Sequence, residues 1–309
     1  MSRAAPHGAE VACVLAEGDY FHGVAALINS LVLNGFTGTV LVGYRGALPG
    51  WAAGPLPEEV EIRFVALAPG WHLTNLKPRF LLDALTLHCP GAARAWHFDA
   101  DVVVMGPWAH FARWAEAGVL AVLDVADSFM VPEHAFRDAW RALAARAGFA
   151  CREMTGYVNA GFLGVPRAHL RFLEVWEALL RRREAEGTDM GRLVMAEGFP
   201  EFARADQDIL NAAFMASDAP YRLLGVEAMG RFPFMQLLGH SMMFAKPWRR
   251  NHILDALKGF QPDHPERAFW RYAEGPIRSF TPAQWRWKRL QRRVGRLIGY
   301  VHRRSLIEW

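Results

Sequence analysis

Short apolar runs alternate with amphipathic stretches along the first half of the chain. Runs of consecutive apolar residues predict buried strands, and apolar positions three or four residues apart predict helices. We expect strands at 10–15, 39–43, 60–67, 95–98 and 119–123, and helices at 20–34 and 77–88. Strands that alternate with helices at this spacing form a mostly parallel sheet with helices on both faces. The predicted fold class is therefore α/β.

The second half of the chain is less regular. Helical periodicity occurs at 134–147, 167–186, 206–215 and 248–257. Residues 157–165 predict two short strands around Gly161. The proline-containing stretches 49–57 and 262–265 are typical of loops. The chain contains no internal repeat and no low-complexity segment.

Length and composition describe a globular protein with a sizeable core. The 309 residues are 52% hydrophobic and 21% charged, which excludes disordered, collagen-like and small disulfide-stapled chains. Cys13, Cys89 and Cys151 are too few and too scattered for a disulfide framework or a thiolate metal site, so we expect a reducing compartment. Residues 1–16 do not resemble a secretory signal, and no apolar run reaches the length of about 18 residues that spans a membrane. We therefore expect a cytoplasmic protein.

The net charge of +4 is unevenly distributed. Residues 277–309 contain nine Lys or Arg and one Glu, whereas residues 1–276 contain 26 Lys or Arg and 30 Asp or Glu. Nucleic-acid enzymes usually place basic charge around the site, so an acidic body argues against a nucleic-acid partner. The sequence also has no dinucleotide-binding glycine motif, no phosphate-binding loop ending in Gly-Lys-Ser/Thr and no Gly-x-Ser-x-Gly elbow.

Two carboxylates, Asp99 and Asp101, follow the apolar strand expected at 95–98. Ligands of α/β sheets bind at the carboxyl ends of strands. Two hard oxygen donors suit Mg²⁺ or Mn²⁺ carrying a diphosphate. The alternative is a strand-end turn with solvated carboxylates.

A second candidate segment contains His240 six residues before Lys246, which Pro247 and Trp248 hold in a loop. Mn²⁺ accepts an imidazole beside carboxylates, and a lysine can neutralise phosphate oxygens. Considered alone, a single histidine is more often a structural or surface residue.

Two further segments contain polar side chains next to apolar elements. Asn159-Ala160-Gly161 allows a ligand to approach the backbone closely, or else forms a tight turn with a left-handed asparagine. Asp206-Gln207-Asp208 opens an expected helix, where Asp206 is either a reactive group or the N-cap.

Together and in this order, the four segments resemble the retaining glycosyltransferases of family 8, which have the GT-A fold. The family pattern of Asp-x-Asp, Asn-Ala-Gly, Asp-Gln-Asp and His-x-x-Gly-x-x-Lys-Pro-Trp is matched at 99–101, 159–161, 206–208 and 240–248. Met243 stands where the family has glycine, which weakens the expectation that the backbone there packs closely on a diphosphate. The resemblance covers residues 9–258.

The resemblance implies a GT-A domain over residues 1–260, with a mostly parallel central sheet flanked by helices, and a basic tail over 261–309. It implies transfer of a hexose from a UDP-sugar to an acceptor hydroxyl with retention of configuration, dependent on Mn²⁺ or Mg²⁺. Asp99, Asp101 and His240 would bind the metal, and Asp206 and Gln207 would be catalytic. The donor-binding residues would be Asp19 and Tyr20 (beside uracil), Lys77 or Arg79, Asp124 or Asp127, Asn159, Gly161, Asp208 and Lys246.

Two alternatives to this interpretation differ in what the site does. A sugar-1-phosphate nucleotidyltransferase would need a glycine-rich basic loop after the first strand, and residues 16–23 do not supply one. A non-catalytic module that binds nucleotide sugars or glycans would keep the fold without the reaction.

The basic tail predicts an amphipathic helix over 285–298. Leu290, Val294, Leu297 and Val301 fall on one stripe and the arginines occupy the remaining arc. Such a helix suits the surface of an anionic bilayer, so we expect peripheral attachment to the inner face of a membrane, with a lipid-linked or glycan acceptor. The alternative is a helix that packs on the domain or on a partner.

Overall fold

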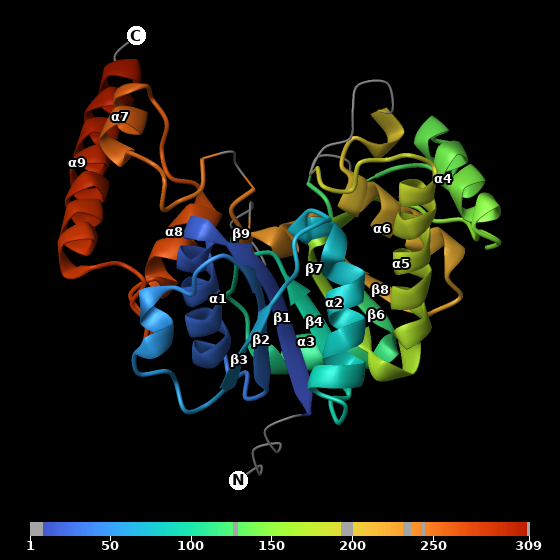
Figure 1. Cartoon of the computed structure of the whole chain (residues 1–309). Helices are drawn as coiled ribbons and strands as arrows, with labels where there is room; N and C mark the ends of the chain where they lie inside the picture. Colours follow the sequence, from blue (N-terminus) through green and yellow to red (C-terminus); the bar gives the residue numbers. More distant parts are fainter. Residues whose placement is uncertain (1–8, 126–128, 193–199, 231–235, 243–244, 308–309) are drawn as a thin grey trace.

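A seven-stranded sheet forms the centre of the molecule (Figure 1), in a computed structural model that describes residues 9–125, 129–192, 200–230, 236–242 and 245–307. The strand order is β3-β2-β1-β4-β7-β6-β8. The strands are β1 (Glu10–Glu17), β2 (Thr39–Arg45), β3 (Glu61–Ala66), β4 (Arg94–Phe98), β6 (Val119–Leu123), β7 (Val158–Pro166) and β8 (Tyr221–Leu224). Neighbouring strands pair in parallel except at β7, which is antiparallel to β4 and β6. The α/β class with a mostly parallel sheet is confirmed.

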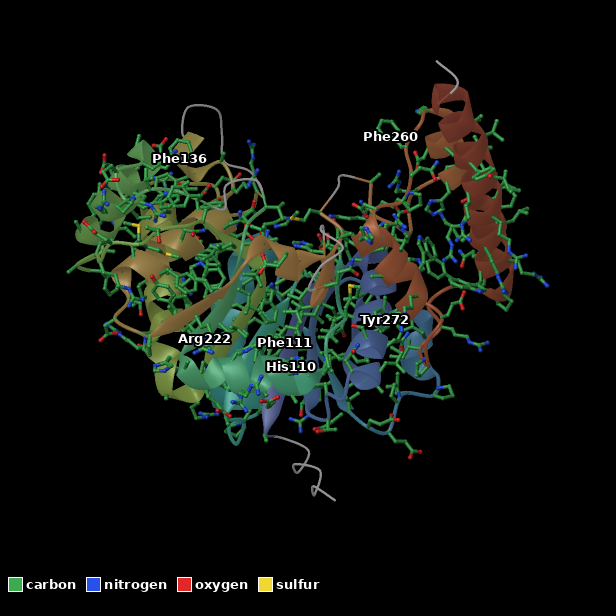
Figure 2. All side chains as sticks on the ribbon, turned by 180° about the vertical axis from the view of Figure 1, so that it is seen from behind. His110, Phe111, Phe136, Arg222, Phe260 and Tyr272 are labelled. Carbon is green, nitrogen blue, oxygen red and sulfur yellow. The ribbon has the colours of Figure 1, made fainter. Side chains whose placement is uncertain are left out.

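Helices cover both faces of the sheet, and the alternation along β1 shows how. Val11, Cys13 and Leu15 enter one core, while Ala12 and Val14 enter the other, because successive strand side chains point to opposite faces. The first core also receives α2 (Lys77–Asp83), α4 (Ala135–Arg146), α5 (Leu170–Ala185) and α6 (Ala205–Ala216). The second receives α1 (Phe21–Leu33) and α3 (Trp108–Trp114), where buried Phe111 packs on Trp108 (Figure 2).

A second, two-stranded sheet joins distant parts of the chain. β5 (Val102–Val104) follows the turn after β4 and pairs antiparallel with β9 (Leu238–His240). Helix α8 (His264–Tyr272) packs on this sheet and on α1. The side chain of Asn29 in α1 fixes the end of α8, since its Nδ2 donates to the carbonyls of Tyr272 and Ile277 at 2.9 Å each.

Helices α7 (His252–Leu257) and α9 (Pro282–Ile307) pack against each other at one end of the molecule (Figure 1). The buried side of α9 carries Gln291, Gly295 and Gly299 at successive turns. A Cβ on Gly295 would overlap the carbonyl of His252, and one on Gly299 would overlap the amide of Gln261. Close approach of the α9 backbone to that of α7 therefore requires glycine at position 295, whereas at position 299 the neighbouring group is the end of the Gln261 side chain.

Three of the four residues of the expected apolar stripe of α9 are exposed, and only Val294 is partly buried. Leu290, Leu297 and Val301 are 48%, 67% and 66% exposed. Among the described helices, none is both long enough and apolar enough to cross a bilayer.

Some expected elements differ in the structure. The prediction of two short strands around Gly161 is wrong, because the single strand β7 runs unbroken through this residue. The helix expected at 248–257 begins only at His252, where Asn251 caps it. The loop expected at 262–265 already contains the start of α8, because Asp263 accepts a hydrogen bond from the Glu266 amide as its N-cap. The helix expected at 77–88 is α2 followed by one wider, π-type turn.

Candidate active site

Three ligand-type side chains converge at the carboxyl end of β4. Asp99 and Asp101 lie in the turn from β4 to β5, and the pairing of β5 with β9 places His240 opposite Val102. The amide of Ser241 donates to the carbonyl of Asp101 at 3.0 Å, which fixes the register of the two segments. Nε2 of His240 lies 3.3 Å from Oδ1 of Asp101 and 3.9 Å from Oδ2 of Asp99. One ligand atom from each residue lies within 4.8 Å of the other two.

The donor set fits a divalent metal ion. Adjacent ligands of an octahedral Mg²⁺-sized ion are about 3 Å apart, close to the separations seen here. Two carboxylates and one imidazole are ligands that Mn²⁺ accepts readily. Asp101 and His240 are almost fully buried, so an ion there would be held away from bulk water.

Gly161 in β7 makes room for the histidine. A Cβ at this position would overlap Cε1 of His240, and the Gly161 carbonyl accepts the Asp99 amide at 2.9 Å. One glycine therefore positions two of the three ligands, a structural role that differs from the donor-sugar contact expected from the resemblance.

Lys77 is the cation at the centre of this region. Its Nζ lies 2.9 Å from Oδ1 of Asp99, 2.8 Å from Oδ2 of Asp206 and 3.0 Å from the carbonyl of Ala160. Burial alone would lower the pKa of Lys77, but the two carboxylates outweigh it and the pKa is raised. The ammonium is therefore a permanent charge that joins α2, β4 and α6.

Arg79 lies on the same helix but outside the centre. It pairs with Asp83 one turn along α2 and approaches Glu177 of α5, and its side chain is half exposed. Of the two basic residues that the sequence left open, the structure brings Lys77 to the carboxylates.

His97 was not singled out by the sequence analysis, although it also contacts Asp99. Its Nε2 lies 3.1 Å from Oδ1 of Asp99. Burial would raise the pKa of Asp99, but Lys77 and then His97 outweigh it, and the pKa is lowered. The spacing of His97 and Asp99 could have identified this contact, because side chains two residues apart in an extended chain point to the same face.

Lys246 lies on the other side of the ligand cluster. Its Nζ donates to Oδ2 of Asp101 at 2.5 Å and to the carbonyl of Ser241 at 3.1 Å. Burial would raise the pKa of Asp101, but His240 and then Lys246 outweigh it, so the pKa is lowered. Lys246 is thus beside the candidate metal site, where an ammonium can face diphosphate oxygens.

Gln207, Asp124 and Asn159 form a connected hydrogen-bond network behind the ligands. Gln207 accepts the Ala160 amide at 3.1 Å and donates to Oδ2 of Asp124 at 3.2 Å. Nδ2 of Asn159 donates to the same carboxylate oxygen at 2.7 Å, while its Oδ1 accepts the Gly161 amide at 2.8 Å. The network orients the amides and connects β6, β7 and α6.

Asp208 is turned away from the ligands toward Tyr157. The Tyr157 hydroxyl donates to Oδ1 of Asp208 at 2.6 Å, and the Arg204 amide donates to Oδ2 at 2.8 Å. Burial raises the pKa of Asp208 to about 7. One oxygen therefore joins α6 to the residue before β7, and the other accepts the backbone amide at the N-terminus of α6.

Asp19 and Tyr20 meet the segment that follows Lys246. Asp19 forms a two-fold ion pair with Arg249, and Tyr20 packs edge-on against Trp248 with ring centroids 5.6 Å apart. Arg249, which the sequence analysis missed, connects the loop after β1 to the segment before α7. Asp127 and Met243 lie outside the described residues.

Comparisons with known proteins identify the fold. No family model and no curated protein matches the chain. A structure of the galactosyltransferase LgtC with donor and acceptor sugar analogs matches with a TM-score of 0.51 at 15% identity, over 90% of this chain and 99% of that one. An active-site variant of LgtC matches with a TM-score of 0.53 at 18% identity over the same shares.

The glycosyltransferase GlyE of Streptococcus pneumoniae TIGR4 matches with a TM-score of 0.50 at 14% identity, over 85% of this chain. The present chain spans 60% of the length of GlyE. At these identities the comparisons show the architecture, which is a GT-A-like glycosyltransferase fold.

Proposed function

We propose that the protein transfers a hexose from a UDP-sugar to an acceptor hydroxyl, with retention of configuration and with the help of Mn²⁺ or Mg²⁺. The observation that carries this proposal is the convergence of Asp99, Asp101 and His240, with Lys246 beside them, in a GT-A-like fold. The likeness to LgtC, whose structure contains donor and acceptor sugar analogs, supports the same class of ligands.

The side chains around the ligand cluster match the charges of the proposed reaction. Breaking the bond between sugar and diphosphate places negative charge on the departing diphosphate and positive charge on the sugar. A divalent ion held by Asp99, Asp101 and His240 would supply Lewis-acid stabilisation of the departing diphosphate. Lys246 adds a second positive charge at the same place.

Asp206 and Gln207 are the proposed groups that face the reacting sugar. Lys77 holds the Asp206 carboxylate, and the Ala160 amide with Asp124 orients the Gln207 amide. Retention requires either a covalent carboxylate intermediate or front-face attack assisted by the leaving group. In both routes a fixed carboxylate and a fixed amide stabilise the electron-poor sugar better than mobile ones.

The proposal is tested with a panel of UDP- and GDP-sugars in the presence of Mn²⁺, measuring nucleotide release and transfer. We expect turnover with a UDP-hexose, and a loss of about 100-fold or more in Asp101→Asn. Asp218→Asn, an exposed aspartate in the turn after α6, is the matched control and should keep wild-type turnover. Metal-dependent turnover that survives in Asp101→Asn would contradict the metal assignment.

Asp206 is tested separately because its role is on the sugar side. Asp206→Asn should lower turnover strongly while the binding of UDP and Mn²⁺ stays close to that of the wild type. Wild-type turnover in this variant would remove Asp206 from the reaction. A protein that binds the UDP-sugar but never releases nucleotide would be the non-catalytic module instead.

We propose in addition that α7 and α9 attach the enzyme to the inner face of an anionic membrane. The exposed stripe of α9 is joined by Leu254, Leu257 and Phe260 of the α7 region, which are 52%, 57% and 62% exposed (Phe260 is labelled in Figure 2). Basic residues of α9 near such a surface contribute about 1 kcal/mol each. Membrane attachment would bring the site close to a lipid-linked acceptor.

A further inference from the structure

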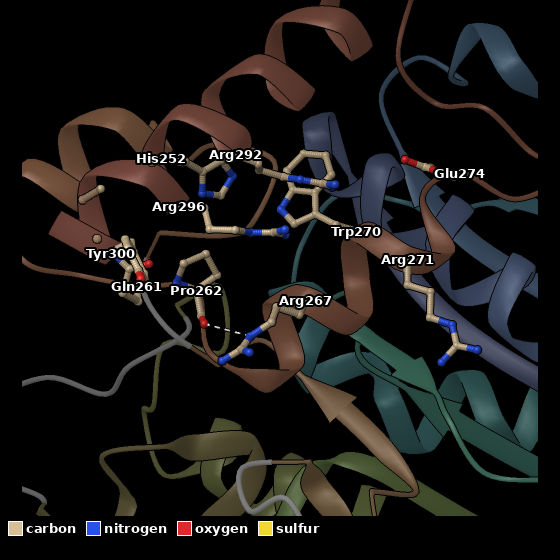
Figure 3. Close-up of a pocket in the computed structure, with 13 residues that line it drawn as sticks. His252, Gln261, Pro262, Arg267, Trp270, Arg271, Glu274, Arg292, Arg296 and Tyr300 are labelled. Carbon is tan, nitrogen blue, oxygen red and sulfur yellow. Dashed lines mark hydrogen bonds between the residues drawn. The ribbon is translucent and has the colours of Figure 1, made fainter. Parts of the chain in front are cut away.

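A cavity of about 600 Å³ lies between α7, α8 and α9. None of the residues that line it belongs to the carboxylate centre, which consists of Lys77, Asp99, Asp101, Asp124, Asp206 and His240. The volume of the cavity is typical of small-molecule sites. Figure 3 shows the guanidinium of Arg296 reaching from α9 toward Trp270, between His252 and Pro262. The cavity therefore has polar side chains from three helices directed into one space.

The lining of this cavity is strongly basic. Arg267 and Arg271 come from α8, Arg292 and Arg296 come from α9, and Glu274 is the one acidic residue among the lining residues. Burial lowers the pKa of His252 to about 4, so this imidazole is neutral near pH 7. The lining then carries a net charge of +3.

Several buried polar atoms at this cavity lack hydrogen-bond partners within the described part of the chain. Nδ1 of His252 lies 3.2 Å from Oε1 of Glu266, whereas its Nε2 has no partner, although the residue is only 3% exposed. One terminal nitrogen of Arg292 and the indole nitrogen of Trp270, which is 4% exposed, are also buried without a partner. Buried polar groups are nearly always hydrogen-bonded in proteins, so the unpartnered N–H groups of Arg292 and Trp270 indicate a ligand with acceptor atoms.

Arg292 and Arg267 are positioned by their surroundings. The Arg292 guanidinium lies over the Trp270 ring, 4.9 Å from its centroid. Nε of Arg267 donates to the carbonyl of Pro262 at 3.1 Å, which leaves its terminal nitrogens available (Figure 3). Arginines held in this way lose little conformational freedom when they bind an anion.

We propose that this cavity binds a phosphate-bearing ligand at a second site, distinct from the proposed donor site. Planar guanidinium groups match phosphate oxygens in pairs, and a phosphate ester carries about −1.5 to −2 charges at pH 7. That charge complements a lining of +3 better than a single carboxylate does. Trp270, Pro262 and Tyr300 supply the apolar surface that the carrier of the phosphate would contact.

The proposal is tested on the full chain with inorganic pyrophosphate as the probe, by calorimetry in a chelator. Arg296→Gln removes an exposed arginine that forms no hydrogen bond or ion pair within the described part of the chain, so folding should be unaffected. We expect this variant to bind pyrophosphate about tenfold more weakly. Arg293→Gln, an equally exposed arginine of α9 outside the cavity, should change binding less than about twofold.

Two further measurements make the result specific to the cavity. Asp101→Asn should bind pyrophosphate as the wild type does in the chelator, because the donor site is not involved. Equal losses in Arg296→Gln and Arg293→Gln, a loss in Asp101→Asn instead, or no binding to the wild type would each overturn the proposal.

The source of the phosphate is decided by two soluble probes. Short-chain phosphatidic acid, used below its micelle concentration, represents a lipid headgroup, and glucose 6-phosphate represents a phosphorylated glycan. Tighter binding of one probe, lost in Arg296→Gln and kept in Arg293→Gln, supports the cavity and identifies that source. Failure of both probes to compete with pyrophosphate would contradict a site for phosphate esters.

Discussion

The carboxylate centre and the C-terminal helices α7–α9 both contain buried charges, but the charges are paired in the first region and incompletely paired in the second. In the centre, Lys77 has two carboxylates and Asp124 has two amides, so cations and anions satisfy one another. Around the cavity at α9, donors outnumber acceptors and His252 keeps an unpartnered nitrogen. A paired network contributes to holding a fold in shape, whereas an unpaired one is suited to binding a ligand.

The largest expected effect breaks the pairing in the centre. Lys77→Met leaves Asp99 and Asp206 without their shared cation, and removing one partner of a buried ion pair costs about 3–5 kcal/mol of unfolding free energy. Arg79→Met removes an exposed cation from the same helix and should cost less than about 1 kcal/mol. Denaturant unfolding of both variants measures the difference. Similar losses would mean that the centre does not depend on its paired charges.

A smaller effect is expected where β7 meets His240. Gly161→Ala places a Cβ against the imidazole and should cost about 1–3 kcal/mol of unfolding free energy through overpacking. Because His240, a proposed metal ligand, is displaced, Mn²⁺ binding measured by calorimetry should weaken as well. The control is Gly91→Ala, where a Cβ meets no atom within 4 Å. Unchanged Mn²⁺ affinity in Gly161→Ala would show that the glycine does not position the histidine.

The pH dependence of stability tests the burial of Asp208. Its folded pKa of about 7 lies above the unfolded value of about 4, so the folded state binds the proton more tightly. The stabilisation that protonated Asp208 gives the folded state is fully present below pH of about 4 and is lost as the pH rises to about 7. Over this range the unfolding free energy falls by at most about 1.4 kcal/mol per pH unit. Asp208→Asn should flatten that part of the curve of unfolding free energy against pH. An unchanged slope would contradict the raised pKa.

The smallest effect on stability is expected at the exposed stripe of α9. Leu297→Gln should change the unfolding free energy by less than about 0.5 kcal/mol, because the side chain is already in solvent. Co-sedimentation with anionic vesicles should nevertheless fall severalfold, since burial of one leucine contributes about 1.5–3 kcal/mol. Leu87→Gln, which is 66% exposed and follows α2, is the control. Equal vesicle binding by both variants and the wild type would argue against membrane attachment.

Most of the helices and the longer strands could be predicted because their signals are local, whereas α3 and α8 were not predicted. Residues 11–15 and 119–123 are continuous apolar runs, and α1 and α6 have clear helical periodicity. The three-residue strands β5 and β9 were not predicted, because so short a segment has no measurable period. Their pairing is nevertheless what brings His240 to the carboxylates.

Motif order identified most of the residues in the centre, but not their arrangement. Lys77 and Arg79 were equivalent candidates on one predicted helix, and only the packing of α2 against β4 and α5 distinguishes them. His97 and Arg249 were missed, since their partners are recognised only when strands and loops are assembled. The sequence also predicted the apolar stripe of α9, but not that its glycines, rather than its leucines, approach α7.

By itself the sequence determined the α/β class, the order of the candidate motifs and the amphipathic character of the last helix, because each depends on neighbouring residues and their spacing. Only the tertiary structure decided which of Lys77 and Arg79 enters the centre, why residue 161 is glycine and which side of α9 remains exposed. These features depend on contacts between segments far apart in the chain, and such contacts exist only once β5 and β9 pair and the helices pack.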